Sequence, residues 1–597
     1  MRRGRRSRCR CRASAPRPDR IRPDHRARPR HRVRSASGTR PGSSPPPAPP
    51  APLRLVASAR PPDRPPRHPT ARARHGTSTG VHRGDLVVGA AASTGSCARR
   101  PVESAAVAPR RRPDVDIVQV RTLRSPDAVT ARVRELGLGL AVDPEIDPHG
   151  PLSQPLAVAG REAPNRFCVL PMEGWDGEGD GRPSDLVRRR WQRFGAGGAG
   201  IVWAEATAVR PDGRANPRQL VIGEHTVDAL AALRTHLAAA HVDGGGDAAG
   251  PVVGLQLTHS GRWSRPDGTP RPRVAYRHPL LDARVGLDGP TGTGGAAEGD
   301  GAVLDDDELD TLVDDFVRAA VRARQAGFDF VDVKHCHGYL LHELLSAVDR
   351  PGRYGGDLDG RTAFLRRVVD GIRAAAPGLG LALRLSAFDV VPHEPGPGGR
   401  GVPVPAAPDP YPYAFGGDGT GLGVDMTETH ALLRRAASWG VELVSVTAGS
   451  PYWCPHVQRP AYFPPSDGYE PPRDPLVEVD RLVRVTAELA AAHPDLTIVA
   501  SGLSYLQQWL PHAGQALVAA GGAAAVGYGR MALSYPHLPA DVLAGRRLDV
   551  RRICRTLSDC TTAPRLGLVS GCYPYDPYYK GLPERDVLVA AKAEAGR

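Results

Sequence analysis

Four side chains that can bind or release protons lie within six residues, namely Lys334, His335, His337 and Tyr339. They follow the apolar run from Phe328 to Val333, which predicts a short buried strand. In a parallel α/β barrel, side chains at the C-terminal ends of the strands face the active site. The spacing therefore predicts an active site here, and the alternative is a strand end that is merely solvated.

Such a strand needs partners, and the chain supplies seven more apolar runs of strand length. The eight expected strands are Arg166–Met172, Gly200–Val209, Val252–His259, Phe328–Lys334, Leu379–Ser386, Val441–Thr447, Leu496–Ser501 and Ala523–Gly529. Amphipathic helices separate them, for example Thr226–Ala240, Asp306–Ala326, Arg361–Ala376, Thr427–Trp439 and Asp480–Ala492. Eight βα units predict an α/β fold of the (βα)8 TIM-barrel type over residues 113–550.

Two Gly/Pro-rich insertions interrupt the repeats, Arg265–Gly301 after the third strand and Pro392–Gly423 after the fifth. Both follow the C-terminal end of a strand. They are expected either to line the site or to form surface loops, and the sequence leaves both open.

The first 112 residues differ in composition from the rest. They contain 28 Arg and 5 acidic residues, a net charge of +23, so the remaining residues carry 14 − 23 = −9. The basic balance thus belongs to this extension, and the charge of the body does not indicate nucleic acid. With few branched apolar or aromatic residues, residues 1–112 are expected to be disordered. A nucleic-acid-binding tail, a transit peptide and a mis-assigned start remain open, and we favour the last.

The cysteines and the apolar runs of the sequence bear on the cellular compartment of the protein. The cysteines form no secreted disulfide framework, which favours the cytoplasm. The sequence contains no run of about 18 apolar residues, so it predicts no membrane-spanning helix. We expect a small-molecule substrate, neither nucleic acid nor membrane as partner, and allow for a homo-oligomer.

The segment from Lys334 to Leu340, the turn from Arg353 to Gly356 and the helix start at Arg361 together resemble the old yellow enzyme family of FMN-dependent oxidoreductases. In that family a strand ends in His-x-x-His/Asn-Gly-Tyr-Leu and a Tyr-Gly-Gly turn follows. Lys334 departs from it, because the family usually has His there, or Tyr in its amine dehydrogenases.

The resemblance implies a set of FMN-binding residues on other strands. Backbone at Pro171 and Met172 would touch the flavin ring, small Ala206 would lie against it, and Gln256 would meet its pyrimidine edge. Arg384 would lie beside flavin N1 and the C2 carbonyl. Gly502, Gly529 and Arg530 would hold the phosphate, and Glu173 stands where the family often has Thr. A carboxylate there would repel the flavin carbonyl, so Glu173 is expected either to have a raised pKa or to turn away.

The resemblance also implies the reaction. NAD(P)H would reduce FMN, and an activated alkene would then be reduced. Lys334 and His337 would hold its carbonyl oxygen, and Tyr339 would give a proton to its α-carbon. The aromatic loop with Tyr452, Trp453 and His456 would contact substrate or pack on the rim. The alternatives are an amine or other dehydrogenase of the trimethylamine dehydrogenase-like branch, a barrel without flavin, such as a lyase, and a nucleic-acid-tethered protein.

The tail, residues 551–597, carries Cys554, Cys560 and Cys572 with the spacing of the four-iron cluster motif of larger family members. Leu557 occupies the second ligand position. We therefore expect a degenerate motif and no metal, with a cluster that uses an unusual fourth ligand as the alternative.

Overall fold

The computed structural model describes residues 117–287, 299–466 and 468–594. All of them belong to one compact unit. The predicted disordered extension, residues 1–112, and residues 288–298 of the first insertion lie outside the described residues.

Eight parallel strands close into a barrel in the order β3-β4-β5-β6-β7-β10-β11-β12. Their bounds are β3 Phe167–Val169, β4 Ile201–Ala208, β5 Val252–Thr258, β6 Phe330–Val333, β7 Gly380–Ser386, β10 Leu443–Thr447, β11 Thr497–Ala500 and β12 Ala525–Tyr528. Each lies within one of the eight runs predicted from the sequence. The TIM-barrel prediction is therefore confirmed, and the strands are shorter than the apolar runs because the run ends enter loops.

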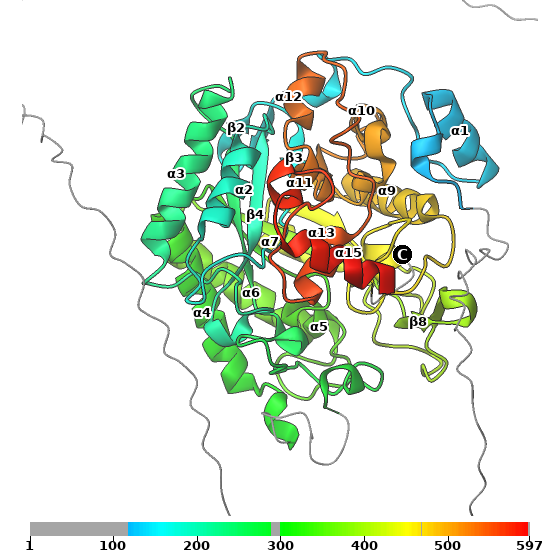
Figure 1. Ribbon diagram of the computed structural model, residues 1–597. Coiled ribbons are helices and arrows are strands. Elements are labelled where there is room, and N and C mark those ends of the chain that lie inside the picture. Colours follow the sequence, from blue (N-terminus) through cyan, green and yellow to red (C-terminus); the bar gives the residue numbers. More distant parts are fainter. Residues whose placement is uncertain (1–116, 288–298, 467, 595–597) are drawn as a thin grey trace, which may run out of the picture. The chain divides into compact units, whose positions relative to one another are not determined.

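Helices surround the barrel (Figure 1). Their bounds are α1 Pro126–Glu135, α2 Asp185–Gly195, α3 Val227–Asp243, α4 Asp306–Gln325, α5 Leu340–Leu345, α6 Leu358–Ala375, α7 Thr427–Trp439, α8 Pro455–Gln458, α9 Pro475–Ala492, α10 Leu510–Ala519, α11 Arg530–Ser534, α12 Leu538–Leu543, α13 Asp559–Arg565, α14 Pro577–Lys580 and α15 Glu584–Glu594. Side-chain caps define the starts of several of them, although α3 and α7 have none. Asp305 and Glu308 form a capping box on α4, and Asp357 caps α6.

A small hairpin, β1 Leu156–Val158 and β2 Arg161–Ala163, precedes the barrel. Its Val158 and Ala163 join an apolar cluster with Phe330 and other residues of the barrel strands. Arg161 pairs with Asp329 just before β6. The hairpin therefore covers the N-terminal ends of the strands and leaves the C-terminal ends for a site.

The tail lies over the barrel rather than apart from it. Figure 1 shows α13 and α15 crossing the barrel. Arg189 and Arg193 of α2 both pair with buried Asp576 just before α14. Within the described residues, no helix is both long and apolar enough to cross a membrane.

Candidate active site

A cavity of about 810 Å³ opens at the C-terminal ends of the barrel strands. Every barrel strand except β4 places a residue in its wall, either at its own end or just after it. From β3 to β12 these are Met172, Gln256, Lys334, Arg384, Thr447, Gly502 and Gly529. The site predicted at the end of β6 is therefore shared by residues from almost the whole barrel.

Lys334 and Tyr339 meet inside this cavity. The Lys334 ammonium lies 3.6 Å from the centre of the Tyr339 ring, a cation–π contact. Both side chains are buried. Burial lowers the pKa of Lys334, while the charge of Glu173 opposes that change. Burial also raises the pKa of Tyr339 well above its usual range, so the phenol keeps its proton at neutral pH.

A sharp turn after β6 brings these groups together. His337 has φ 66° and Gly338 has φ 76°, both in the left-handed region. A Cβ on Gly338 would come within 2.2 Å of the Trp453 ring, so only glycine fits. Hydrogen bonds fix the turn, from the His337 amide to Ser386 Oγ and from Ser450 Oγ to the His337 carbonyl.

His337 lines the cavity as predicted. Its Nε2 lies 3.0 Å from Nε2 of Gln458, which reaches in from α8. Burial, together with the charges of Arg384 and Lys334, lowers its pKa well below the usual value. His337 is therefore neutral at neutral pH and can donate or accept one hydrogen bond.

Glu173 turns toward Tyr339. The Tyr339 hydroxyl donates to Glu173 Oε2 at 2.6 Å, and Asn216 and Gln219 donate to the two carboxyl oxygens at 3.4 and 3.3 Å. Burial raises the pKa of Glu173, and the Lys334 charge offsets part of that rise. The raised pKa agrees with one of the two outcomes expected for this carboxyl, and the other, that it turns away from the flavin carbonyl, stays a prediction.

Gln256 and Arg384 share a buried carboxylate. The Gln256 amide nitrogen and the Arg384 backbone amide both donate to Asp332 on β6. Burial raises the pKa of Asp332 to about 6 despite these bonds. Because the Gln256 nitrogen is committed, its carbonyl oxygen is left as an acceptor for a ligand. The Arg384 guanidinium donates to the Pro171 carbonyl at 2.7 Å, which joins two of the predicted flavin contacts.

The predicted phosphate residues lie on the β11 and β12 side of the cavity, namely Gly502, Gly529 and Arg530. Gly502 has φ 84°, which a side chain would strain. Arg530 donates through Nη2 to the Pro460 carbonyl. Among the described residues, Arg530 Nη1 and Arg384 Nε are buried with no hydrogen-bond partner. Other buried guanidinium nitrogens, such as Arg350 Nε, also lack a partner, but these two lie in the cavity wall and can donate to an acceptor ligand there.

The cavity wall is strongly cationic. Eleven lining residues are Arg or Lys, and Glu173 is the one acidic residue among the lining residues. Part of this charge is neutralised, because Arg190 pairs with Asp176 and Glu205 behind the wall. The remainder favours anionic ligands such as a phosphate.

Four residues singled out from the sequence lie elsewhere. Ala206 is buried and is not part of the wall, and its carbonyl accepts a hydrogen bond from Gln219. His335 turns back to the Val333 carbonyl. Trp453 bonds to Asp389 and His456 to Tyr469, both outside the wall. Tyr452, by contrast, lines the cavity and stacks on Trp263 at 4.2 Å.

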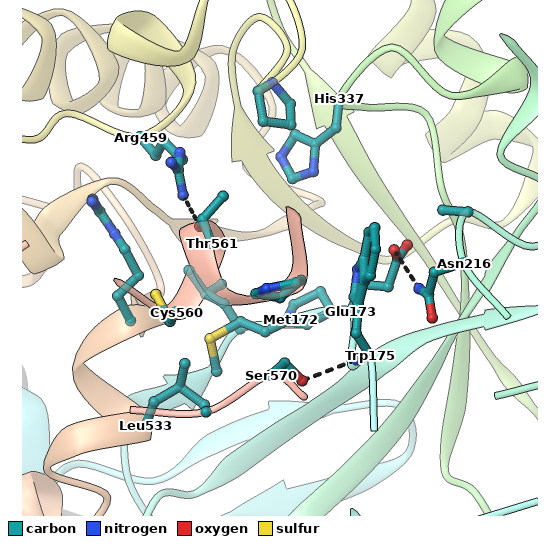
Figure 2. Close-up of a pocket in the computed structure, with 18 of the residues that line it drawn as sticks. Met172, Glu173, Trp175, Asn216, His337, Arg459, Leu533, Cys560, Thr561 and Ser570 are labelled. Carbon is teal, nitrogen blue, oxygen red and sulfur yellow. Dashed lines mark hydrogen bonds between the residues drawn. The ribbon is translucent and has the colours of Figure 1, made fainter. Parts of the chain in front are cut away.

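The cavity wall also contains residues that the sequence did not single out, among them Thr561 and Ser570 of the tail. Thr561 accepts a hydrogen bond from Arg459, and Ser570 accepts one from the Trp175 amide at 2.9 Å (Figure 2). Of the first insertion, Arg265, Gly268 and Arg284 line the cavity, whereas the described part of Pro392–Gly423 does not. No local motif signals the two hydrogen bonds, because they join residues 102 and 395 positions apart.

The tail cysteines do not assemble as a metal centre. In the described part of the chain, no group of three or more His, Cys, Asp or Glu is arranged to hold a metal ion. Cys560 and Cys572 line the cavity, and burial raises the pKa of Cys554 to about 11. Leu557 offers no donor atom in the second position of the motif. The residues present therefore do not fit a four-iron cluster.

We expect anaerobically purified protein to contain far less than one four-iron cluster per chain, because Leu557 replaces one of the four cysteines of the motif and the described residues form no metal-holding group. Iron and acid-labile sulfide analysis measures this. Stoichiometric iron and sulfide would contradict the prediction and would require a fourth ligand from elsewhere.

Residues 151–396 match the family model described as the NADH:flavin oxidoreductase / NADH oxidase family. The NADPH dehydrogenase of Bacillus subtilis (strain 168) is 27% identical over 242 residues, which is 40% of this chain and 64% of that protein. The NADPH dehydrogenase of Bacillus pumilus is 30% identical over 244 residues, with the same shares. The chain thus spans slightly less than two thirds of the length of these relatives.

Two solved structures share the fold. A 2-naphthoyl-CoA reductase in complex with 2-naphthoyl-CoA is 18% identical, with a TM-score of 0.53 over 74% of this chain and 58% of its own. The histamine dehydrogenase from Rhizobium sp. 4-9 is 19% identical, with a TM-score of 0.51 over 72% of this chain and 53% of its own. At these identities the likeness concerns the fold alone.

Proposed function

We propose that the protein is an FMN-dependent oxidoreductase with NAD(P)H as electron donor, because residues 151–396 match the model of the NADH:flavin oxidoreductase / NADH oxidase family. Members of the old yellow enzyme family use FMN in this way. The observation that carries the proposal is the convergence of the predicted flavin residues on one cavity. Pro171, Met172, Gln256, Arg384, Gly502, Gly529 and Arg530 all line it.

These residues fit FMN chemically. The open donors on Arg384 and Arg530 suit an electron-rich ring edge and a phosphate, and the free Gln256 oxygen suits an N–H donor. Together with the cationic wall, they match a ligand that carries both a phosphate and a polar ring edge. When bound, FMN would supply hydride acceptance and donation at its N5 position.

For the second substrate we propose an activated alkene that carries a carbonyl group. Lys334 and neutral His337 would donate hydrogen bonds to its carbonyl oxygen, which gains negative charge during reduction. Tyr339 would supply the proton for the α-carbon. Lys334 and Tyr339 are buried and His337 is half-buried, which limits access of water and strengthens these interactions.

An amine substrate is the second candidate, and Glu173 is the feature that favours it, because a carboxylate can hold an ammonium ion. However, Lys334 lies beside Glu173, and ten further cationic residues line the same wall. Arg189, Arg190 and Arg193 are paired with carboxylates, but the other cationic residues would repel a cationic substrate, so the cavity supports the carbonyl compound better.

The purified protein is expected to be yellow and to release FMN, and not FAD, on denaturation, because one phosphate subsite lies at Gly502, Gly529 and Arg530. Visible absorption and chromatography of the released flavin test this. NAD(P)H should then bleach the bound flavin. An enone should restore the yellow colour of the reduced protein, and an amine should not bleach the oxidised protein. A protein that stays colourless after titration with FMN would refute the proposal.

A further inference from the structure

The hydroxyl proton of Tyr339 points to Glu173, although a general acid needs it to point to the substrate. The Tyr339 hydroxyl has one hydrogen, and in the structure that hydrogen is donated to Glu173 at 2.6 Å. A general acid must instead point its proton at the substrate. While Glu173 is an ionised carboxylate it holds this hydrogen, so Tyr339 is a poor donor toward the cavity.

Building on the proposed function, we propose that Glu173 is the proton-holding and positioning partner of Tyr339 and supports proton transfer only in its neutral form. A neutral Glu173 donates to the Tyr339 oxygen, which frees the Tyr339 hydrogen to turn into the cavity. The short contact between the two oxygens suits a bond whose direction can reverse.

The surroundings of Glu173 allow this switch. Asn216 and Gln219, from the segment after β4, hold both of its oxygens and fix its orientation. Nearby Glu205 on β4 raises the pKa of Glu173 further, although Glu205 is itself paired with Arg190. Burial is the largest cause of the raised pKa, so the neutral form persists to higher pH than in a free glutamic acid.

Two other titratable groups face Glu173 from neighbouring elements. Lys334, at the end of β6, lowers the pKa of Glu173, which limits how far burial can raise it. Tyr452, after β10, lies 3.3 Å from the Tyr339 oxygen. Burial raises the pKa of Tyr452 as well, so it stays protonated in the range where Glu173 titrates.

The proton transfer balances as follows. The O–H bond of Tyr339 breaks and a C–H bond forms at the substrate α-carbon, while the hydride at the β-carbon derives from NAD(P)H. The Tyr339 oxygen then takes the proton of Glu173, whose O–H bond breaks to leave a carboxylate. Water at the cavity mouth returns a proton to Glu173 before the next turnover.

The test follows the single-turnover rate of enone reduction against pH in flavin-loaded protein. The wild-type rate should fall about tenfold per pH unit above the pKa of Glu173, because the neutral form is lost. In Glu173→Gln this limb should vanish, since an amide does not titrate. In Glu173→Asp the limb should persist at a displaced pH. Glu178→Gln, an exposed acid on the same segment, should keep the wild-type profile.

A second readout does not depend on turnover. Infrared difference spectra of wild type minus Glu173→Gln should show the carbonyl stretch of a protonated carboxylic acid, which disappears at the same pH as the kinetic limb. A limb that survives in Glu173→Gln, or a carboxyl already ionised well below the limb, would overturn the inference. If NAD(P)H failed to reduce the bound flavin, the proposed function would be refuted. The infrared titration would still report the protonation state of Glu173.

Discussion

Tyr339→Phe is expected to slow enone reduction by about 10²–10⁴-fold, the usual contribution of a general acid. The substitution keeps the ring beside Lys334 and removes only the hydroxyl that lies 2.6 Å from Glu173. Flavin reduction by NAD(P)H needs no proton from Tyr339, so its rate should stay within a few-fold. Stopped-flow absorbance of the two half-reactions separates these effects.

Tyr354→Phe provides the matched control. Tyr354 is also buried and also donates to a carboxylate, Asp310, but it does not line the cavity. It should leave both half-reactions near wild type. If Tyr339→Phe slowed both halves equally, or neither, Tyr339 would be a packing residue and not the proton donor.

Lys334→Met is expected to weaken the binding of carbonyl ligands and to slow enone reduction by about 10²–10³-fold, the usual cost of removing one oxyanion donor. Methionine keeps much of the buried volume and removes the charge. FMN content should be retained, since Arg384 and Arg530 provide the donors proposed for it. Binding of a phenolic or carbonyl ligand, followed by the flavin spectrum, measures the first effect.

The same variant makes a second, independent prediction about pH. Lys334 lowers the pKa of Glu173, so its removal should raise that pKa and move the kinetic limb to higher pH. Lys580→Met, an exposed lysine outside the cavity wall, serves as the control and should change neither quantity. Unchanged ligand affinity in Lys334→Met would show that this lysine does not hold the substrate oxygen.

The barrel could be predicted from the sequence because its signals are local. A mainly apolar run such as Val252–Thr258 predicts a buried strand, and capping residues such as Asp305 define where α4 begins. Residues at strand ends then follow from the geometry of the fold. Gln256, Lys334, Arg384 and Gly529 therefore reached the cavity as predicted.

Only the tertiary structure determines which atoms of those residues are left to bind a ligand and which are held by other side chains. Glu173 and Tyr339 are 166 residues apart, and nothing in either segment predicts their hydrogen bond. Ala206 lies outside the cavity wall although the flavin was expected to lie against it, and Ser570 lies in that wall because the tail returns to the barrel. Local patterns determine which face of a strand is buried, whereas side-chain partners depend on packing between distant segments.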